Sequence, residues 1–318
     1  QWMILLVLSA VFYYFAATPC TIGYLVVSTM IAYLSTMWIQ KKRDALGREA
    51  KGLLVVTFVA LAVNIAIWFF VKGRGLWVPF ASRLTAWRDV SVLDSLVNWK
   101  IAASLGMGYY TLQVMGYIID CYWENITPQK NPLKLFLFVC YFPQLTTGPI
   151  SRYTQLNTLY SPHRFEYRNL AFGSQRILWG FMKKIVLAER VGMIVSAINA
   201  DPGTYTGFYS WIAILLYPLQ MYADFSGCMD IVLGVSELFG IPLAENFNNP
   251  FFSRSSQEFW QRWHITLGTW AKDYVLYPLL KSKSMVNFGK VTRKKYGKKT
   301  GKFLVNLVGM FMLWMIMG

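Results

Sequence analysis

Residues 3–39 read MILLVLSAVFYYFAATPCTIGYLVVSTMIAYLSTMWI and contain no charged side chain. A helix needs about 20 consecutive apolar residues to cross the hydrocarbon core of a bilayer. This run is too long for one upright span, and Pro19 interrupts it, so it predicts one span over residues 2–17 and a second over residues 22–39. The stretch therefore predicts a helical protein embedded in a membrane.

The composition supports the same conclusion for the whole chain. Hydrophobic residues make up 55% of the 318 residues and charged residues only 14%, whereas an average soluble domain carries about 25% charged residues. Residues 53–71 form another stretch without a charge. The composition excludes a soluble globular domain, a disordered chain and a coiled coil, and it indicates a multi-pass membrane protein with about eight to ten apolar segments.

Two segments differ from simple spans. Residues 133–145 are apolar but short and carry Pro143, which predicts a re-entrant or buried segment. Residues 258–274 have aromatic residues on one helical face and charged residues on the other, which predicts an amphipathic helix lying at the membrane interface. The predicted fold is all-α: one multi-pass transmembrane helical domain over residues 1–318, with re-entrant segments and an interfacial amphipathic helix.

The cations lie between the apolar runs. The net charge is +16, but no compact basic domain is present, so nucleic-acid binding is excluded. The basic loops 40–51 and 281–302 are predicted to be cytoplasmic, because short loops rich in Lys and Arg stay on that side. Residues 281–302 hold nine Lys or Arg and no acidic residue, and these cations are expected at anionic lipid or at an acidic donor carrier.

Carboxylates occur inside one apolar region. Asp224, Ser226 and Asp230 lie in the sequence QMYADFSGCMD, residues 220–230. An ionised carboxylate within a membrane is costly and must face a polar interior or a partner. Two interpretations follow: a structural polar network between helices, or the lining of a substrate or proton pathway.

His264 lies within the predicted amphipathic helix, at the border of the aromatic stripe that includes Trp263. A histidine at such a border is either a hydrogen-bonded structural residue or a catalytic group directed into the seam between helices. His163 lies in a loop, and the four cysteines show no paired spacing, so neither a metal site nor a disulfide framework is predicted.

Two irregular segments contain the remaining candidates. Arg152 ends the Pro- and Gly-rich segment 141–152, and Asn246 and Asn248 belong to the segment 246–252 that precedes the aromatic helix. Such residues are typical of turns. Irregular backbone at membrane depth also lines cavities, so both roles stay open.

Five motifs occur in order: GYYTLQ at 108–113 followed by YIIDCY at 117–122, FPQLTTGPISR at 142–152, DFSGCMD at 224–230, ENFNNPF at 245–251 and EFWQRWHITL at 258–267. Together they resemble the membrane-bound O-acyltransferase family, and within it the bacterial alginate O-acetylase branch. The resemblance extends over the whole chain. The D-alanyl transferases of teichoic acid share the FWxRWH pattern and are the alternative.

The resemblance implies an O-acyltransferase of the bacterial cytoplasmic membrane. It would pass an acyl group, acetyl in this branch, from a cytosolic thioester (acetyl-CoA or a carrier-protein thioester) towards hydroxyls of an exported polysaccharide or cell-wall glycan, with a periplasmic or extracellular partner acyltransferase. His264 would orient the reacting groups, while Arg152, Asp224, Ser226, Asp230, Asn246, Asn248 and Trp263 would line the passage. No bound cofactor or metal is implied.

The resemblance also implies a second histidine, the catalytic base of the family, beyond Gly318. The chain is accordingly expected to be truncated at both ends and inactive by itself. A membrane transporter is the rival class, since transporters also use intramembrane acids and broken helices. Transporters often show paired broken segments in two halves, and no such pairing is visible in the sequence.

Overall fold

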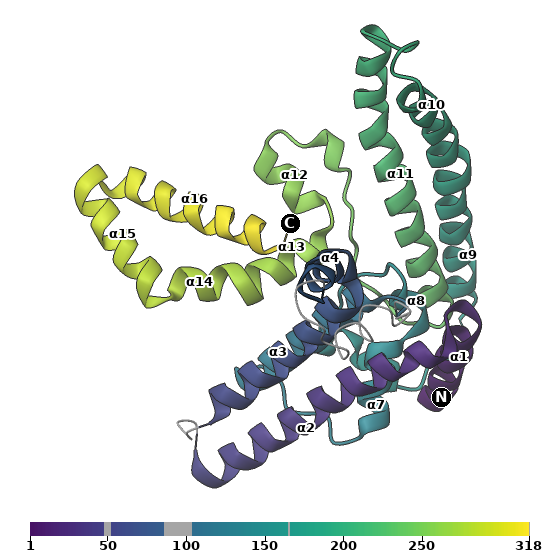
Figure 1. Ribbon diagram of the computed structural model, residues 1–318. Coiled ribbons are helices and arrows are strands. Elements are labelled where there is room, and N and C mark those ends of the chain that lie inside the picture. Colours follow the sequence, from purple (N-terminus) through teal and green to yellow (C-terminus); the bar gives the residue numbers. More distant parts are fainter. Residues whose placement is uncertain (48–51, 86–103, 165, 318) are drawn as a thin grey trace. The chain divides into compact units, whose positions relative to one another are not determined.

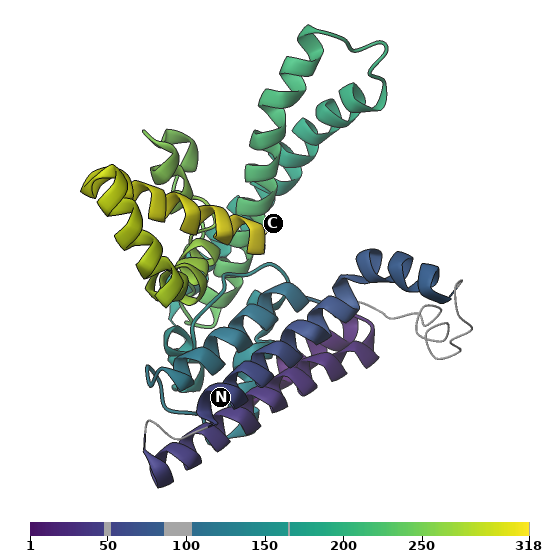
Figure 2. The ribbon, with the colours of Figure 1, turned by 60° about the vertical axis from the view of Figure 1, so that its left-hand side comes forward.

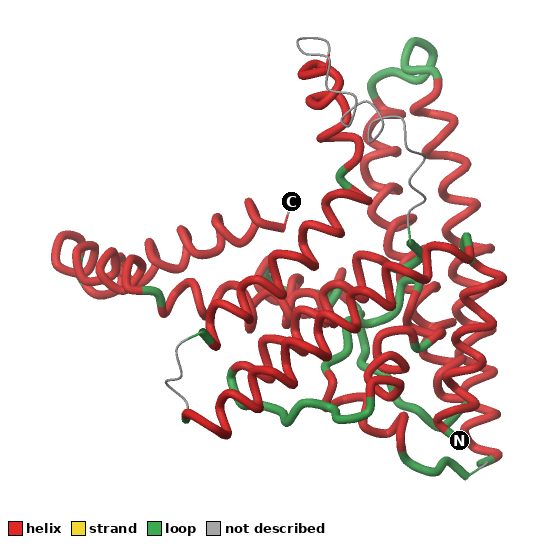
Figure 3. The backbone as a smooth tube through the Cα atoms, turned by 60° about the horizontal axis from the view of Figure 1, so that its bottom comes forward, coloured by secondary structure: helices red, strands yellow, loops and turns green. Residues whose placement is uncertain are grey.

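The computed structural model describes residues 1–47, 52–85, 104–164 and 166–317. In these ranges every regular element is a helix, apart from one isolated bridge between Phe247 and Trp263 (Figure 3). The predicted all-α class is therefore confirmed. The chain forms two compact units, Gln1–Ala244 and Glu245–Gly318.

The first unit begins with the helices that the apolar runs predict (Figure 1). They are α1 (Trp2–Ala16), α2 (Ile22–Leu46) and α3 (Leu53–Lys72). The short 3₁₀ helix η1 (Pro19–Thr21) lies between α1 and α2, and α4 (Arg74–Thr85) follows α3; no apolar run predicts these two elements. The predicted break at Pro19 is present. However, α2 continues past residue 39 to Leu46. Arg43, in its last turn, donates hydrogen bonds to the carbonyl oxygens of Cys121 (3.2 Å) and Tyr122 (2.7 Å).

Two helices in the described ranges are long and apolar enough to cross a bilayer. They are Pro19–Leu46, with mean hydropathy 1.6, and Leu53–Lys72, with mean hydropathy 2.6. The Ser28 hydroxyl donates a hydrogen bond of 2.5 Å to the Asn64 side-chain oxygen, which joins α2 to α3. Polar contacts of this kind hold helices together where lipid surrounds them. The further spans expected from the sequence stay predictions.

The core of the first unit includes buried residues of α1, α2 and α3. These residues pack with buried residues of α6 (Met107–Tyr122), α7 (Pro132–Cys140), α8 (Phe142–Leu145) and the 3₁₀ helix η2 (Tyr153–Tyr160). The predicted short segment 133–145 is thus two helices that meet at Tyr141, which is fully buried. Gly106 precedes α6 with φ +66°, and a Cβ there would lie 1.6 Å from the Leu145 carbonyl oxygen, so only glycine fits.

The second half of this unit is a long helical hairpin (Figure 2). One arm contains α9 (Tyr167–Phe181), the π-helical turn η3 (Met182–Ala188) and α10 (Glu189–Ala200), and the other arm is α11 (Phe208–Leu238). The apolar stretches 208–221 and 223–238 of the sequence belong to one continuous helix. Pro218 lies inside α11 and does not end it.

Paired glycines let the two arms approach closely. Gly173 faces Gly234, and Gly180 faces Gly227. A Cβ added at Gly180 would lie 2.6 Å from the Gly227 carbonyl oxygen, and one at Gly227 would lie 2.8 Å from the Gly180 carbonyl oxygen. Small residues at both contacts are what close backbone packing between membrane helices requires.

The second unit is a chain of shorter helices followed by a hairpin. Its elements are the 3₁₀ turn η4 (Pro250–Phe252), α12 (Ser256–Arg262), α13 (Ile265–Ala271), the π-helical turn η5 (Lys272–Leu276), α14 (Tyr277–Lys281), α15 (Lys283–Tyr296) and α16 (Lys298–Met317). Helices α15 and α16 fold back on each other at Gly297 (Figure 1), whose φ of +83° suits glycine.

We predict that Gly180→Ala lowers the stability of the protein, because the new methyl group would force the two arms of the hairpin apart. Overpacking of this kind costs about 1–3 kcal/mol. Gly23→Ala is the matched control, since a Cβ at Gly23 meets nothing within 4 Å. Melting in detergent, followed by tryptophan fluorescence, measures both variants. A Gly180→Ala protein that melts at or above the parent temperature would contradict the proposed packing.

Candidate active site

A short antiparallel pairing organises the second unit around residue 264. The Asn248 amide donates to the Arg262 carbonyl oxygen (3.0 Å), and the Ile265 amide donates to the Asn246 carbonyl oxygen (3.0 Å). This pairing occupies backbone groups that a continuous helix would use internally. The single amphipathic helix predicted over residues 258–274 is therefore wrong: α12 ends at Arg262 and α13 begins at Ile265.

His264 lies at this break with φ +44° and ψ +55°, in the left-handed region. A residue with a Cβ costs of order 1–3 kcal/mol in such a sparsely populated conformation and stays there only if its surroundings enforce it. Strained residues of this kind cluster at functional sites. The conformation turns the backbone sharply between the two helices.

Asn246 enforces that conformation. Its side-chain oxygen accepts hydrogen bonds from the Thr266 amide (3.0 Å) and the Thr266 hydroxyl (2.6 Å). Asn246 is only 1% exposed. The carboxamide therefore satisfies an amide in the first turn of α13 that would otherwise lack a helical partner. We refer to Asn246, Thr266 and the backbone pairing of residues 246–248 with 262–265 as the Asn246 clamp.

His264 faces a mostly apolar cavity of about 240 Å³. The cavity is lined by residues of α12, α13, η5 and α16 and of the break between α12 and α13: Trp260, Trp263, His264, Leu267, Gly268, Ala271, Lys272, Met310 and Leu313. Lys272 and His264 are the ionisable residues in this lining. A concave, mostly apolar pocket with a few polar groups is the usual form of a small-molecule site.

Trp263 is held in place by two neighbouring rings. It stacks on Phe259, with ring centroids 5.6 Å apart and an interplanar angle of 17°, and it meets the edge of Phe247 at 5.1 Å and 83°. Aromatic pairs in these geometries contribute beyond their buried area. One wall of the cavity is therefore fixed next to His264.

Burial lowers the pKa of His264 to about 4. The residue lies outside the two candidate spans. Its imidazole is consequently neutral at pH 7, and a neutral imidazole donates a hydrogen bond from one nitrogen and accepts one at the other. Such a group can orient a hydroxyl or stabilise a developing negative charge in an apolar cavity.

Asp224, Ser226 and Asp230 lie on α11 and make contacts across the hairpin of the first unit. Arg176 contacts the Asp230 carboxylate with Nε at 3.1 Å and Nη2 at 3.0 Å, and Lys183 also pairs with Asp230. The sequence left two interpretations open, a structural polar network between helices and the lining of a pathway. These contacts favour the polar network.

The same hairpin contains two further polar contacts. The Lys183 ammonium lies 3.1 Å from the Ser226 hydroxyl, and the Lys184 ammonium lies 2.5 Å from an Asp224 carboxylate oxygen. Sequence reasoning missed Arg176, Lys183 and Lys184 as the partners. The sequence does contain a signal for these partners, because basic residues interrupt the apolar segment 171–200.

Arg152 and Asn248 have local roles in the described contacts. The Arg152 amide donates to the Gln155 side-chain oxygen (2.8 Å) at the start of η2. Asn248 contributes its backbone amide to the pairing with Arg262. Of the residues predicted from the sequence, His264 and Trp263 thus line one cavity, and Asn246 supports the backbone next to them.

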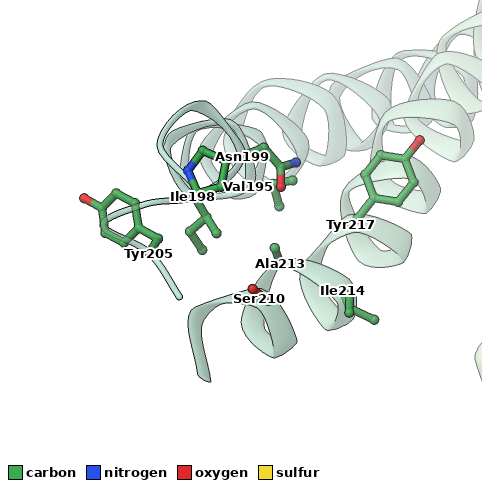
Figure 4. Close-up of a pocket in the computed structure, with 9 residues that line it drawn as sticks. Val195, Ile198, Asn199, Tyr205, Ser210, Ala213, Ile214 and Tyr217 are labelled. Carbon is green, nitrogen blue, oxygen red and sulfur yellow. The ribbon is translucent and has the colours of Figure 1, made fainter. Parts of the chain in front are cut away.

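A second cavity, of about 510 Å³, lies between the end of α10 and the start of α11 (Figure 4). Val195, Ile198 and Ala213 contribute apolar surface, and none of the residues predicted as site residues lines it. No group of three or more His, Cys, Asp or Glu side chains in the described ranges could hold a metal ion.

Comparisons with known proteins identify the family of the chain. The profile of the membrane-bound O-acyltransferase family matches residues 128–293, which include the Asn246 clamp and His264. The chain is 30% identical over 242 residues to a probable alginate O-acetylase of Pseudomonas putida, covering 76% of this chain and 49% of that protein. It is 32% identical over 203 residues to a peptidoglycan O-acetyltransferase of Helicobacter pylori, covering 55% and 38%.

A third relative is a teichoic acid D-alanyltransferase of Streptococcus thermophilus, 27% identical over 266 residues, which cover 72% of this chain and 63% of that protein. The chain spans about half the length of the alginate O-acetylases that it matches. The profile match extends over more than half of the 318 residues. The chain belongs to the membrane-bound O-acyltransferase family.

Proposed function

We propose that the protein is an O-acyltransferase that passes an acetyl group from a cytosolic thioester towards hydroxyls of an exported polysaccharide or cell-wall glycan. The donor is acetyl-CoA or a carrier-protein thioester. The observation that carries the proposal is the position of His264, at a strained break and facing an apolar cavity inside the family-matched segment. Relatives named as alginate and peptidoglycan O-acetyltransferases support acetyl as the acyl group.

The reaction sets the role of His264. A hydroxyl oxygen attacks the thioester carbonyl, the carbon–sulfur bond breaks, and the hydroxyl proton leaves with a base. Because the pKa of His264 is about 4, its imidazole is a weak base at pH 7 and better suited to donating a hydrogen bond. We assign it to orienting the reactants and stabilising the oxyanion that forms at the carbonyl.

The proposal implies a location and a partner. The donor is made in the cytosol and the acceptor lies outside, so the protein would act in the bacterial cytoplasmic membrane as a multi-pass protein. A periplasmic or extracellular acyltransferase would complete the transfer to the glycan. The remaining predicted lining residues, including Arg152 and Asp224, would belong to the passage only if the helices around them open.

D-Alanyl transfer is the second candidate. The 27% identity to a teichoic acid D-alanyltransferase covers 63% of that relative's length, a larger share than for the alginate O-acetylases. The chemistry is the same ester formation from a thioester. The two candidates differ in the acid that mild base releases from the exported glycan, which is acetate in one case and D-alanine in the other.

We predict that His264→Asn in the full-length protein lowers acyl transfer by at least about 100-fold, the usual effect of losing a group that stabilises a transition state. Asparagine tolerates the left-handed region better than most residues, so the variant removes the imidazole while keeping the backbone. Acetate and D-alanine released from exported glycan of cells that carry each variant are the readout. His163→Asn, the matched control, should transfer at the parental rate.

Two outcomes would count against this assignment. Parental transfer by His264→Asn would show that the imidazole has no part in the reaction. Parental expression and melting are expected for the variant, and a failure to fold would favour a purely structural histidine. Release of D-alanine in place of acetate would leave the proposed site unchanged and would show that the protein is a D-alanyltransferase.

We predict that Asn246→Leu lowers the transfer rate, whereas Asn246→Asp retains most of it. Leucine removes both hydrogen bonds to Thr266 and leaves a buried amide unpaired, at a cost of about 1–3 kcal/mol. Aspartate keeps an acceptor oxygen in the same place. The turnover number and the melting temperature are measured for both. Equal transfer by the two variants would contradict a positioning role for the carboxamide.

A further inference from the structure

The cavity beside His264 is larger than an acetyl group needs. Its volume is about 240 Å³, whereas an engineered protein cavity of about 150 Å³ is large enough to hold benzene. An acetyl group is only about half the size of benzene. The cavity therefore has room for several more carbon atoms than acetyl contains.

The lining beyond His264 is hydrocarbon. Leu267 and Ala271 contribute to it from α13, and Met310 and Leu313 contribute from α16. The lining positions on α13 recur at helical spacing, so the apolar stretch extends for about two helical turns away from His264.

An acyl chain suits this stretch better than the rest of the donor does. CoA and carrier-protein thioesters share a pantetheine arm that carries amide groups, and a buried amide without a hydrogen-bond partner is costly. The α13 side chains that line the cavity between His264 and Lys272 are Leu267 and Ala271, which offer no partner. Lys272 is only partly buried, so its ammonium can reach solvent while its stem lines the cavity.

Gly268 keeps this stretch open. A Cβ added there would meet only the Trp260 carbonyl oxygen, at 3.7 Å, which is an ordinary van der Waals distance. By contrast, close backbone contacts require glycine at Gly180 and Gly227. Glycine inside a helix is less favourable than alanine, and no close contact within the described ranges explains it at Gly268. Space for a ligand explains it instead.

Helix α16 provides another wall at a fixed position. A Cβ at Gly309 would lie 2.9 Å from the Leu280 side chain and 3.2 Å from the Leu276 side chain, so α16 packs closely on α14 and η5. Met310 follows directly and lines the cavity. Its long, flexible side chain occupies space that a smaller residue would leave to the ligand.

We propose that this cavity holds the acyl group of the donor thioester and accepts unbranched acyl groups of about four carbons as well as acetyl, with Gly268 and Met310 setting the upper limit. The inference rests on the proposed function, because it places the reacting carbonyl at His264. The reaction is unchanged. The acceptor hydroxyl oxygen forms the ester bond to the carbonyl carbon, the carbon–sulfur bond breaks, and the thiol leaves with the hydroxyl proton.

The test uses the full-length protein in nanodiscs and measures, by calorimetry, the dissociation constants of S-acetyl-, S-butyryl- and S-hexanoyl-pantetheine. The parent should bind the butyryl compound about tenfold more tightly than the acetyl compound, because two further methylene groups are buried. Gly268→Val fills the space and should reduce this ratio to about one. Met310→Ala should make the hexanoyl compound bind about tenfold more tightly than the butyryl compound.

Two matched controls should keep the parental ratios. Gly23→Val adds the same side chain to α2, where a Cβ meets nothing within 4 Å. Met312→Ala removes a methionine of α16 that has the same 38% exposure as Met310 and is not part of the cavity lining. Empty nanodiscs correct for partition of the compounds into lipid.

Equal binding of the acetyl and butyryl compounds by the parent would overturn the proposal. So would an equal loss of affinity for both compounds in Gly268→Val, because that result would assign the cavity to the pantetheine arm. If Gly268→Val does not fold, an unchanged hexanoyl-to-butyryl ratio in Met310→Ala overturns the proposal by itself. Failure of the proposed function is recognised separately, since cells with the parental protein would then release no acyl acid from exported glycan, whatever the binding ratios are.

Discussion

The pairing of residues 246–248 with residues 262–265 is the constraint on which the site depends. It stops α12 at Arg262 and starts α13 at Ile265, and the Asn246 carboxamide closes it by binding Thr266. His264 then has no helical conformation available and takes φ +44°. Without this pairing, the aromatic segment would form one amphipathic helix, and its imidazole would project from a helix side instead of from a turn beside Trp263.

The chain uses polar groups that are buried or partly buried in two different ways. In the hairpin of the first unit, Asp230 is paired with both Arg176 and Lys183, so the charges join helices where glycines already bring the backbones together. Around His264, the hydrogen bonds of Asn246 hold a strained backbone, and the imidazole faces a cavity. Strain supported by surrounding contacts is typical of a functional site.

The sequence predicted what depends on local pattern. The charge-free run 3–39 and Pro19 located α1, α2 and the turn between them, and the five motifs taken together indicated the family. It could not predict what depends on distant contacts. The break at residue 264 arises from a segment about twenty residues earlier, and nothing in the aromatic periodicity reveals it. Likewise, the partners of Asp224 and Asp230 lie on another helix, and Pro218 is accommodated inside α11.

The central claim is that the Asn246 clamp presents the His264 imidazole to the reacting carbonyl. An experimental structure of the full-length protein in a lipid nanodisc, with a non-hydrolysable thioester analogue bound, tests it most directly. The account predicts a left-handed His264, an intact Asn246–Thr266 contact, and an imidazole nitrogen within about 3 Å of the oxygen that replaces the carbonyl. An unbroken helix through residues 258–274, or an analogue bound away from His264, would contradict it.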